Sequence, residues 1–367
     1  MTGVLSDVVA DATVIVCCGP GGVGKTTSAA AIGIEAARSG RRVVVVTIDP
    51  ARRLADALGL PGGLTGEPQR VATTDGELWA MMLDTPAMFE RVVRRHAGTP
   101  EQADRIVANR FYRNMAGALS GTQEYMASEA LHELHGDERF DLVIVDTPPS
   151  RNALDFLDAP GVLTRFLDHA VFKLLMMPTR TGFRVFSVAT QPILKAIGRV
   201  VGSDVLADAV AFFQAFAGME AGFRQRADGV TRLLHADATK FVLVASPNHE
   251  TIEEATWFAE QLADQGFAVS ATIVNRVQPR FGEATAADAM RRCAAADTKG
   301  AADLASIWHN LADMRRLADS ERAQIAPLAR RVGPETLIEV PLLPTDVHDQ
   351  TALGLLAAHL FGADASI

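Results

Sequence analysis

The amino-acid sequence predicts an α/β fold: a doubly wound, mostly parallel sheet with helical insertions that form a subdomain. Short apolar runs alternate with stretches of helical periodicity at both ends of the chain, which is typical of doubly wound sheets. One of these runs is continuous and β-branched, as expected for a strand covered on both faces. A glycine-rich segment separates the first strand from the first helix.

The elements follow from the pattern in order. Residues 12–18 form a short apolar run that ends in glycines, which predicts a buried strand. Residues 26–38 carry Ala and Ile at helical spacing, and Gly40 ends that helix. Residues 42–48 form the β-branched run. Further core strands are expected at 141–145, 241–245, 269–274 and 336–340, and further helices at 251–265 and 351–360.

Residues 1–367 are expected to form a single α/β domain with helical insertions at about 86–134, 160–234 and 285–331. Apolar residues at helical spacing indicate core more often than a binding groove, and for the second insertion both interpretations stay open. Its apolar residues include Phe166, Val171, Phe172, Leu174, Leu175, Met176, Met177, Phe183, Phe186, Phe212, Phe213 and Phe216.

Composition narrows the function classes. The net charge of −9 argues against a protein that binds nucleic acid or anionic membranes generally. Cys17 and Cys18 are adjacent in a strand and should face opposite sides of the sheet, and the remaining cysteine is Cys293. The sequence has no CxxC pair, no secretory signal and no run of roughly 18 apolar residues, so a cytoplasmic protein is expected.

Residues 19–26 read GPGGVGKT and match the phosphate-binding pattern G-x-x-x-x-G-K-[ST]. Glycines let successive backbone N–H groups surround phosphate oxygens, and the following helix directs its positive end at them. Lys25 is expected to reach the β- and γ-phosphates, and the Thr26 hydroxyl to ligate Mg²⁺. The nucleotide-binding residues expected in this segment are Gly21, Gly22, Val23, Gly24, Lys25, Thr26 and Thr27.

Two aspartates follow predicted strands. In open parallel sheets, ligands bind beyond the carboxyl ends of the strands, so both should lie beside the phosphates. Asp146 follows an apolar strand, as a carboxylate that holds Mg²⁺ through water does. Asp49 is then the expected catalytic residue, which orients or deprotonates the attacking water.

The segments at 21–27, 49–51 and 146–149 resemble those of the deviant Walker A ATPases. Among these, the chain most resembles the arsenical-pump and tail-anchored-protein-targeting ATPase family, over about residues 12–350. Asn275 lies in a segment similar to the one that contacts adenine in that family.

A later segment carries the same resemblance. Pro341 and Leu342 lie in a stretch similar to the Pro-Leu motif that packs beside the base in the family. Residues 275–278 lack the acid that reads guanine in GTP-specific relatives, so ATP is favoured over GTP.

The resemblance implies an ATP-binding and ATP-hydrolysing switch that uses Mg²⁺. It implies coupling to a hydrophobic client or a membrane-associated partner, as a homodimer or a heterodimer with a paralogous ATPase. Two alternatives stay open: the catalytic subunit of an anion or metalloid efflux pump, and a partition or division-site ATPase. No nucleic-acid partner is expected.

One departure from the family concerns Pro20. The family has a lysine there that reaches the phosphates of the other subunit, and proline lacks the charge. Either Arg52 or Arg151 could supply positive charge instead, although a surface salt bridge is the commoner role. A paralogous partner could also contribute the lysine.

Overall fold

A single eight-stranded sheet forms the centre of the computed structural model, which describes residues 3–49, 53–72, 76–110, 112, 122–169, 203–347 and 349–362. Its strands are β1 (Val14–Cys18), β2 (Arg42–Thr47), β3 (Gln69–Val71), β4 (Glu77–Met82), β5 (Leu142–Asp146), β6 (Thr239–Ala245), β7 (Val269–Val277) and β8 (Leu337–Pro341). The order is β3-β4-β2-β5-β1-β6-β7-β8, and every neighbouring pair is parallel except β3–β4. The predicted fold class is confirmed.

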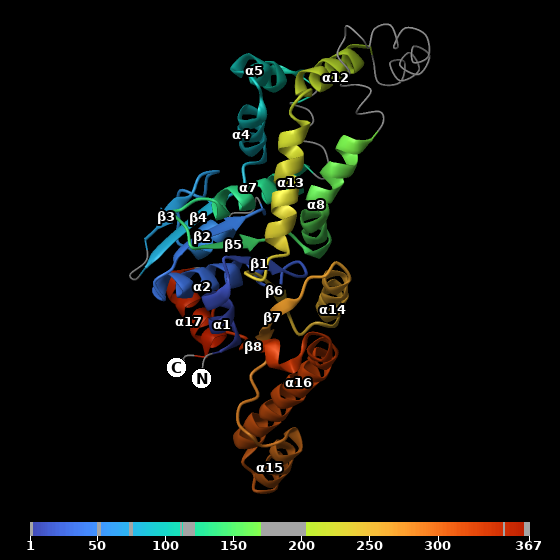
Figure 1. Ribbon diagram of the computed structural model, residues 1–367. Helices are drawn as coiled ribbons and strands as arrows, with labels where there is room; N and C mark the ends of the chain where they lie inside the picture. Colours follow the sequence, from blue (N-terminus) through green and yellow to red (C-terminus); the bar gives the residue numbers. More distant parts are fainter. Residues whose placement is uncertain are drawn as a thin grey trace.

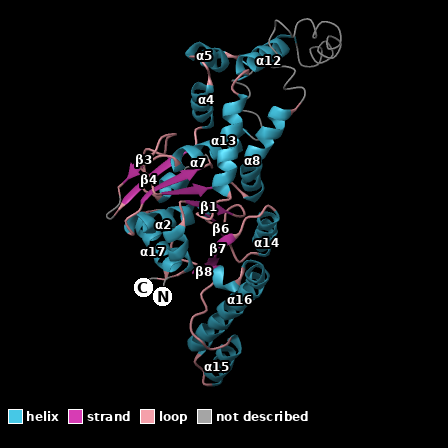
Figure 2. Cartoon of the chain, viewed as in Figure 1, coloured by secondary structure: helices cyan, strands magenta, loops and turns pink. Residues whose placement is uncertain are grey.

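Helices cover both faces of the sheet (Figures 1 and 2). One face carries α1 (Val4–Asp11), α2 (Lys25–Arg38), α3 (Arg53–Ala57) and α17 (Gln350–Phe361). The other carries a larger helical layer, which comprises α4 (Thr85–His96), α5 (Pro100–Ala108), α7 (Thr122–His135), α8 (Ser150–Asp168), α12 (Ser203–Phe216), α13 (Glu220–Leu234) and α14 (His249–Asp264). The chain therefore forms three layers, and α1 and α17, the first and last described helices, contact each other below the sheet in Figure 1.

Alternation along the strands explains why both faces are covered. In β1, Cys17 belongs to the buried cluster under α2, whereas Cys18 belongs to the cluster under the larger helical layer. The two cysteines thus face opposite sides of the sheet, as the sequence predicted. Because apolar side chains project from both sides, the strand is stable only between two helical layers.

Strands β3 and β4 lie outside the predicted set. β4 contains no β-branched residue, so its sequence carries little strand signal. It forms because it pairs with β2 along its whole length, which places Leu78 and Ala80 in the core under α2. Tertiary pairing overrides the local preference here.

The helical stretches also differ in detail from their predicted limits. α8 runs without interruption from Ser150 to Asp168, so the second stretch begins before Pro160, which lies inside the helix. Phe212, Phe213 and Phe216 are buried and pack as core. The Phe166 side chain and residues 170–202, which hold the other apolar residues named for the second insertion, lie outside the described part of the chain.

A helical hairpin of α15 (Ala286–Thr298) and α16 (Ala302–Val332) extends away from the sheet at the bottom of Figure 1. Its inner end joins the core through Ile325 and Leu328. None of the helices that the structure describes is both long and apolar enough to cross a membrane.

Candidate functional site

The loop between β1 and α2 depends on its glycines. Gly24 has φ +99°, and a Cβ there would lie 2.4 Å from the Asn275 amide nitrogen. Gly19 has φ +136°, and a Cβ there would lie 2.1 Å from the Val244 carbonyl oxygen. Both positions require glycine, because a side chain would meet a neighbouring strand in a backbone conformation that other residues rarely adopt. The loop is therefore fitted against β6 and β7.

Lys25 lies at the first position of α2 and folds back over the loop. Its Nζ donates hydrogen bonds to the carbonyl oxygens of Gly19, at 3.0 Å, and of Pro20, at 2.7 Å. The residue is 8% exposed. Burial lowers the pKa of the ammonium group, and the negative charge of Asp146 opposes that shift. The positive charge is thus held at the loop by backbone oxygens.

Asp146 links three elements at the carboxyl end of β5. Its Oδ2 accepts hydrogen bonds from the hydroxyls of Thr26 and Thr47, each at 2.8 Å. The residue is 1% exposed. Burial raises its pKa to about 6, although the hydrogen bonds from Thr47 and Thr26 and the charge of Lys25 all act to lower it. The carboxylate therefore joins the loop to both β2 and β5.

A cavity of about 290 Å³ opens over the loop. Asp49 forms part of its wall. This half-buried residue lies just beyond the carboxyl end of β2. The wall consists of Gly21, Gly22, Gly24, Lys25, Thr26, Thr27, Asp49, Arg53, Thr147, Pro149 and Arg276. We call this space the loop cavity.

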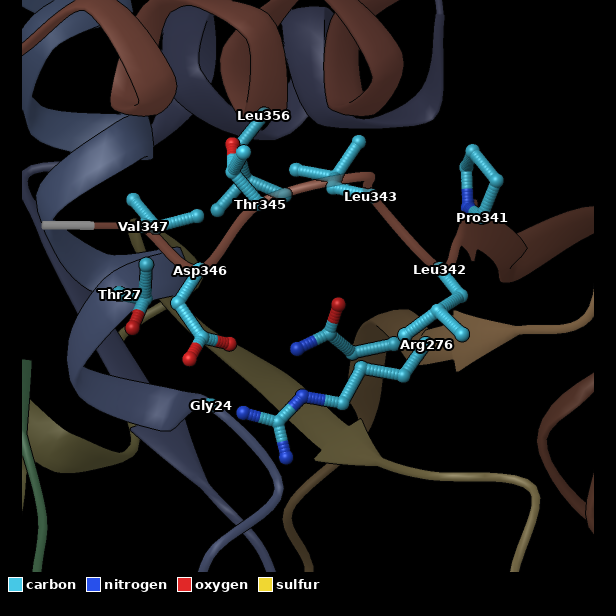
Figure 3. A pocket seen from close by; sticks show the side chains of 11 residues that line it. Gly24, Thr27, Arg276, Pro341, Leu342, Leu343, Thr345, Asp346, Val347 and Leu356 are labelled. Atoms are coloured by element: carbon cyan, nitrogen blue, oxygen red, sulfur yellow. The ribbon is translucent and has the colours of Figure 1, made fainter.

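A second cavity, of about 220 Å³, lies beside the first between the ends of β7 and β8 (Figure 3). Figure 3 shows the Arg276 and Asp346 side chains directed into it. We call it the β7–β8 cavity. It is lined by Gly24, Thr27, Asn275, Arg276, Pro341, Leu342, Leu343, Thr345, Asp346, Val347 and Leu356. Gly24, Thr27 and Arg276 line both cavities, so the two spaces adjoin at these residues.

The structure brings most of the expected site residues to these two cavities. Val23 is an exception, because its side chain lies in the core and its carbonyl oxygen accepts a 2.9 Å hydrogen bond from the Asn275 amide. Asp146 lies behind Thr26 and not in the cavity wall. Arg52 and the side chain of Arg151 lie outside the described part of the chain.

Sequence reasoning missed three charged residues in the cavity walls. Arg53 lines the loop cavity, Asp346 lines the β7–β8 cavity, and Arg276 lines both. Their positions next to predicted site residues could have indicated them, since Arg276 directly follows Asn275 and Asp346 belongs to the Pro-Leu segment. Their orientation depends on tertiary structure.

The larger helical layer is hydrogen-bonded to the strand ends at the site. The Gln123 amide on α7 donates to the carbonyl oxygen of Ile48, which directly precedes Asp49, at 3.0 Å. The buried Ser128 hydroxyl on α7 lies 3.2 Å from the Phe156 carbonyl oxygen on α8, the helix that follows β5. The segments after β2 and β5 are therefore both tied to α7.

The oxygen donors fit a hard cation such as Mg²⁺. The Thr26 hydroxyl and the Asp146 carboxylate lie in hydrogen-bond contact beside the loop cavity, and Mg²⁺ binds through one or two such oxygens while keeping several waters. Within the described residues, no group of three or more His, Cys, Asp or Glu side chains is arranged to hold a metal ion.

Asp146→Asn is expected to stabilise the nucleotide-free protein at pH 8 by about 1–3 kcal/mol. The folded state binds this proton more tightly than the unfolded chain, because burial raises the pKa of Asp146 to about 6. The protonated carboxyl group therefore adds to the free energy of unfolding of the wild type at low pH. This contribution is complete below about pH 4 and is lost as the pH rises to about 6. Denaturant unfolding of the wild type and of Asp146→Asn at pH 5 and pH 8 measures this contribution. If the free energies of unfolding of the two proteins depended on pH in the same way, the raised pKa of Asp146 would be contradicted.

Comparison with known proteins places these features in one family. The model of the anion-transporting ATPases matches residues 12–315. The ATPase GET3 of Malassezia globosa is 26% identical over 266 residues, which cover 72% of each chain. The protein SCO2128 of Streptomyces coelicolor is 30% identical over 300 residues, which cover 79% of this chain and 70% of that protein. Protein Rv2184c of Mycobacterium tuberculosis is 34% identical over 172 residues, covering 44% of this chain and 40% of its own. The chain belongs to the anion-transporting ATPase family.

Proposed function

We propose that this ATPase is a Mg²⁺-dependent molecular switch that couples its nucleotide state to a hydrophobic client or a membrane-associated partner. The observation that carries the proposal is the hydrogen bond from Gln123 to the Ile48 carbonyl oxygen, beside Asp49. Through it, a segment that borders the loop cavity contacts the larger helical layer directly. Movement of that segment on hydrolysis would be transmitted to α7.

In the proposed chemistry, the triphosphate occupies the loop cavity and the base the β7–β8 cavity. Lys25 neutralises the β- and γ-phosphates, and Asp49 orients or deprotonates the attacking water. Mg²⁺ held by Thr26, and through water by Asp146, would neutralise phosphate charge. Asn275 positions the loop through Val23, and Pro341 and Leu342 pack beside the base.

The helical layer supports the coupling. α8 continues directly from the segment after β5, and α13 and α7 both pack on α8. A displacement after Asp146 is therefore expected to reach several helices as one body, because packed helices transmit strain. The client or partner would be bound by this layer.

A metalloid pump is less well supported. Such a site would need thiolates, and burial raises the pKa of Cys17 and raises that of Cys18 to about 12. Both side chains lie in the core on opposite faces of β1, which leaves Cys293 on α15 as the single remaining cysteine in the sequence. We therefore favour the switch.

Lys25→Ala is expected to abolish detectable Mg²⁺-ATP binding, because the triphosphate loses a buried positive charge. Asp49→Asn is expected to keep ATP affinity within about threefold while losing most turnover, since it removes the proton acceptor and leaves the loop intact. Calorimetry gives the affinities and phosphate release gives the rates. Wild-type ATP affinity in Lys25→Ala would refute the site, and wild-type turnover in Asp49→Asn would move the catalytic role elsewhere.

Gln123→Leu is expected to keep ATP affinity but to uncouple the helices. In the wild type, amide hydrogen exchange in α7 and α8, and the binding of an apolar dye, should differ between the ATP and ADP states. Loss of the Gln123 hydrogen bond should reduce that difference. Gln102→Leu is the matched control, because Gln102 bonds the Ala215 carbonyl away from the site. An unchanged difference in Gln123→Leu would contradict the coupling.

Pro20 bears on assembly, and we propose a dimer, either with itself or with a paralogous ATPase. Pro20 is buried and offers only its carbonyl, to Lys25. A cation supplied by another subunit accelerates related reactions by about 10³–10⁵. The isolated chain should therefore hydrolyse ATP slowly. Either a lysine-bearing paralogue or the Pro20→Lys substitution should raise the rate of hydrolysis. Binding of ADP to Pro20→Lys is measured as a control that the variant loop is intact. Brisk turnover of the wild type alone, unchanged in Pro20→Lys, would contradict this.

A further inference from the structure

Arg276 occupies an unusual backbone position. Its φ is +64°, and among the described non-glycine residues only Phe281 shares a positive value. The register between β7 and β8 shifts between Val274 and Val277, so Asn275 and Arg276 lie at an irregularity in the ladder. Irregularities of this kind redirect side chains and occur often beside active sites. Here the result is that both residues line the β7–β8 cavity.

Arg276 forms no ion pair with any residue that the structure describes. Within the described part of the chain, the residue is exposed and has no hydrogen-bond or ion-pair partner. Arg280, four residues further on, pairs with Asp319 at 3.3 Å. Figure 3 shows the Arg276 guanidinium reaching into the β7–β8 cavity, whose wall also includes Gly24 of the loop. An unpaired guanidinium directed into a cavity favours an anionic ligand.

The position of Arg276 indicates which part of a bound nucleotide it would contact. It lines both cavities, with Lys25 in the wall of one and Pro341 in the wall of the other. If the phosphates extend over Lys25 and the base lies by Pro341, the ribose and the α-phosphate cross between the cavities. Thr27, at the same junction, belongs to the first turn of α2, whose N-terminus favours anions.

We propose that Arg276 binds the α-phosphate of the nucleotide and so holds nucleotides irrespective of how many phosphates follow. The inference rests on the proposed function, because it assumes that a nucleotide spans the two cavities. The strained backbone is retained because it directs the guanidinium at the junction. This arrangement makes Arg276 a determinant of affinity common to ADP and ATP, whereas a residue at the γ-phosphate would distinguish them.

Arg276→Gln tests the proposal. Dissociation constants for AMP, ADP and ATP, measured by competition with a fluorescent ADP in the presence of Mg²⁺, should rise by one common factor of roughly tenfold or more. Arg276→Lys should keep part of the affinity, because it retains the charge and loses the planar fork. Arg280→Gln is the matched control: it removes the same charge from an arginine that lines neither cavity, and all three constants should stay at wild-type values.

Arg276→Gly separates function from folding. Glycine adopts a positive φ without strain, so the nucleotide-free variant should melt at a higher temperature than the wild type while binding ADP more weakly. Unchanged constants in both Arg276→Gln and Arg276→Gly would overturn the inference alone. A rise confined to ATP would overturn the assignment to the α-phosphate. A wild type that binds no nucleotide would overturn the proposed function, and this inference with it.

Discussion

The buried Asp146 carboxylate is the constraint on which the site depends. Three chain segments meet at one oxygen atom, since Thr26 brings the loop and Thr47 brings β2 to the end of β5. A carboxylate in the protein interior is costly unless it is hydrogen-bonded, and these hydroxyls together with Lys25 offset only part of that cost. The part of the cost that is not offset raises the pKa of Asp146 above its usual range. The buried carboxylate lowers the stability of the protein but places a preorganised oxygen atom beside the loop, a combination that is common at functional sites.

The layered architecture explains how one site can reach so much of the molecule. β1 lies between β5 and β6, so the loop opens near the middle of the sheet. The same edge of the sheet carries the ends of β2 and β7, which contribute Asp49 and Arg276. On one face, α2 anchors the loop in a tightly packed core. On the other, α7 contacts the segment after β2, and the proposed coupling uses this contact.

Much of this could be predicted from the sequence because the signals are local. Loop chemistry needs glycines, a lysine and a threonine at fixed spacing, and the residues from Gly21 to Thr27 provide them. A parallel strand covered on both faces needs a continuous apolar run, as in β2. Asp49 and Asp146 follow such runs, and the carboxyl ends of parallel strands share one edge. Local composition therefore determined the fold class and the core of the candidate site.

Only tertiary structure decided the rest. β4 has little strand signal of its own and forms because it pairs with β2 along its whole length. Phe212 and its neighbours became core because they pack against other helices. In the sequence, Arg276 lies just beyond the strand expected at 269–274, and only the tertiary structure shows the register shift against β8 and the positive φ that accompany its place in the cavity wall. Contacts between segments distant in sequence set each of these outcomes, and a pattern of neighbouring residues does not encode such contacts.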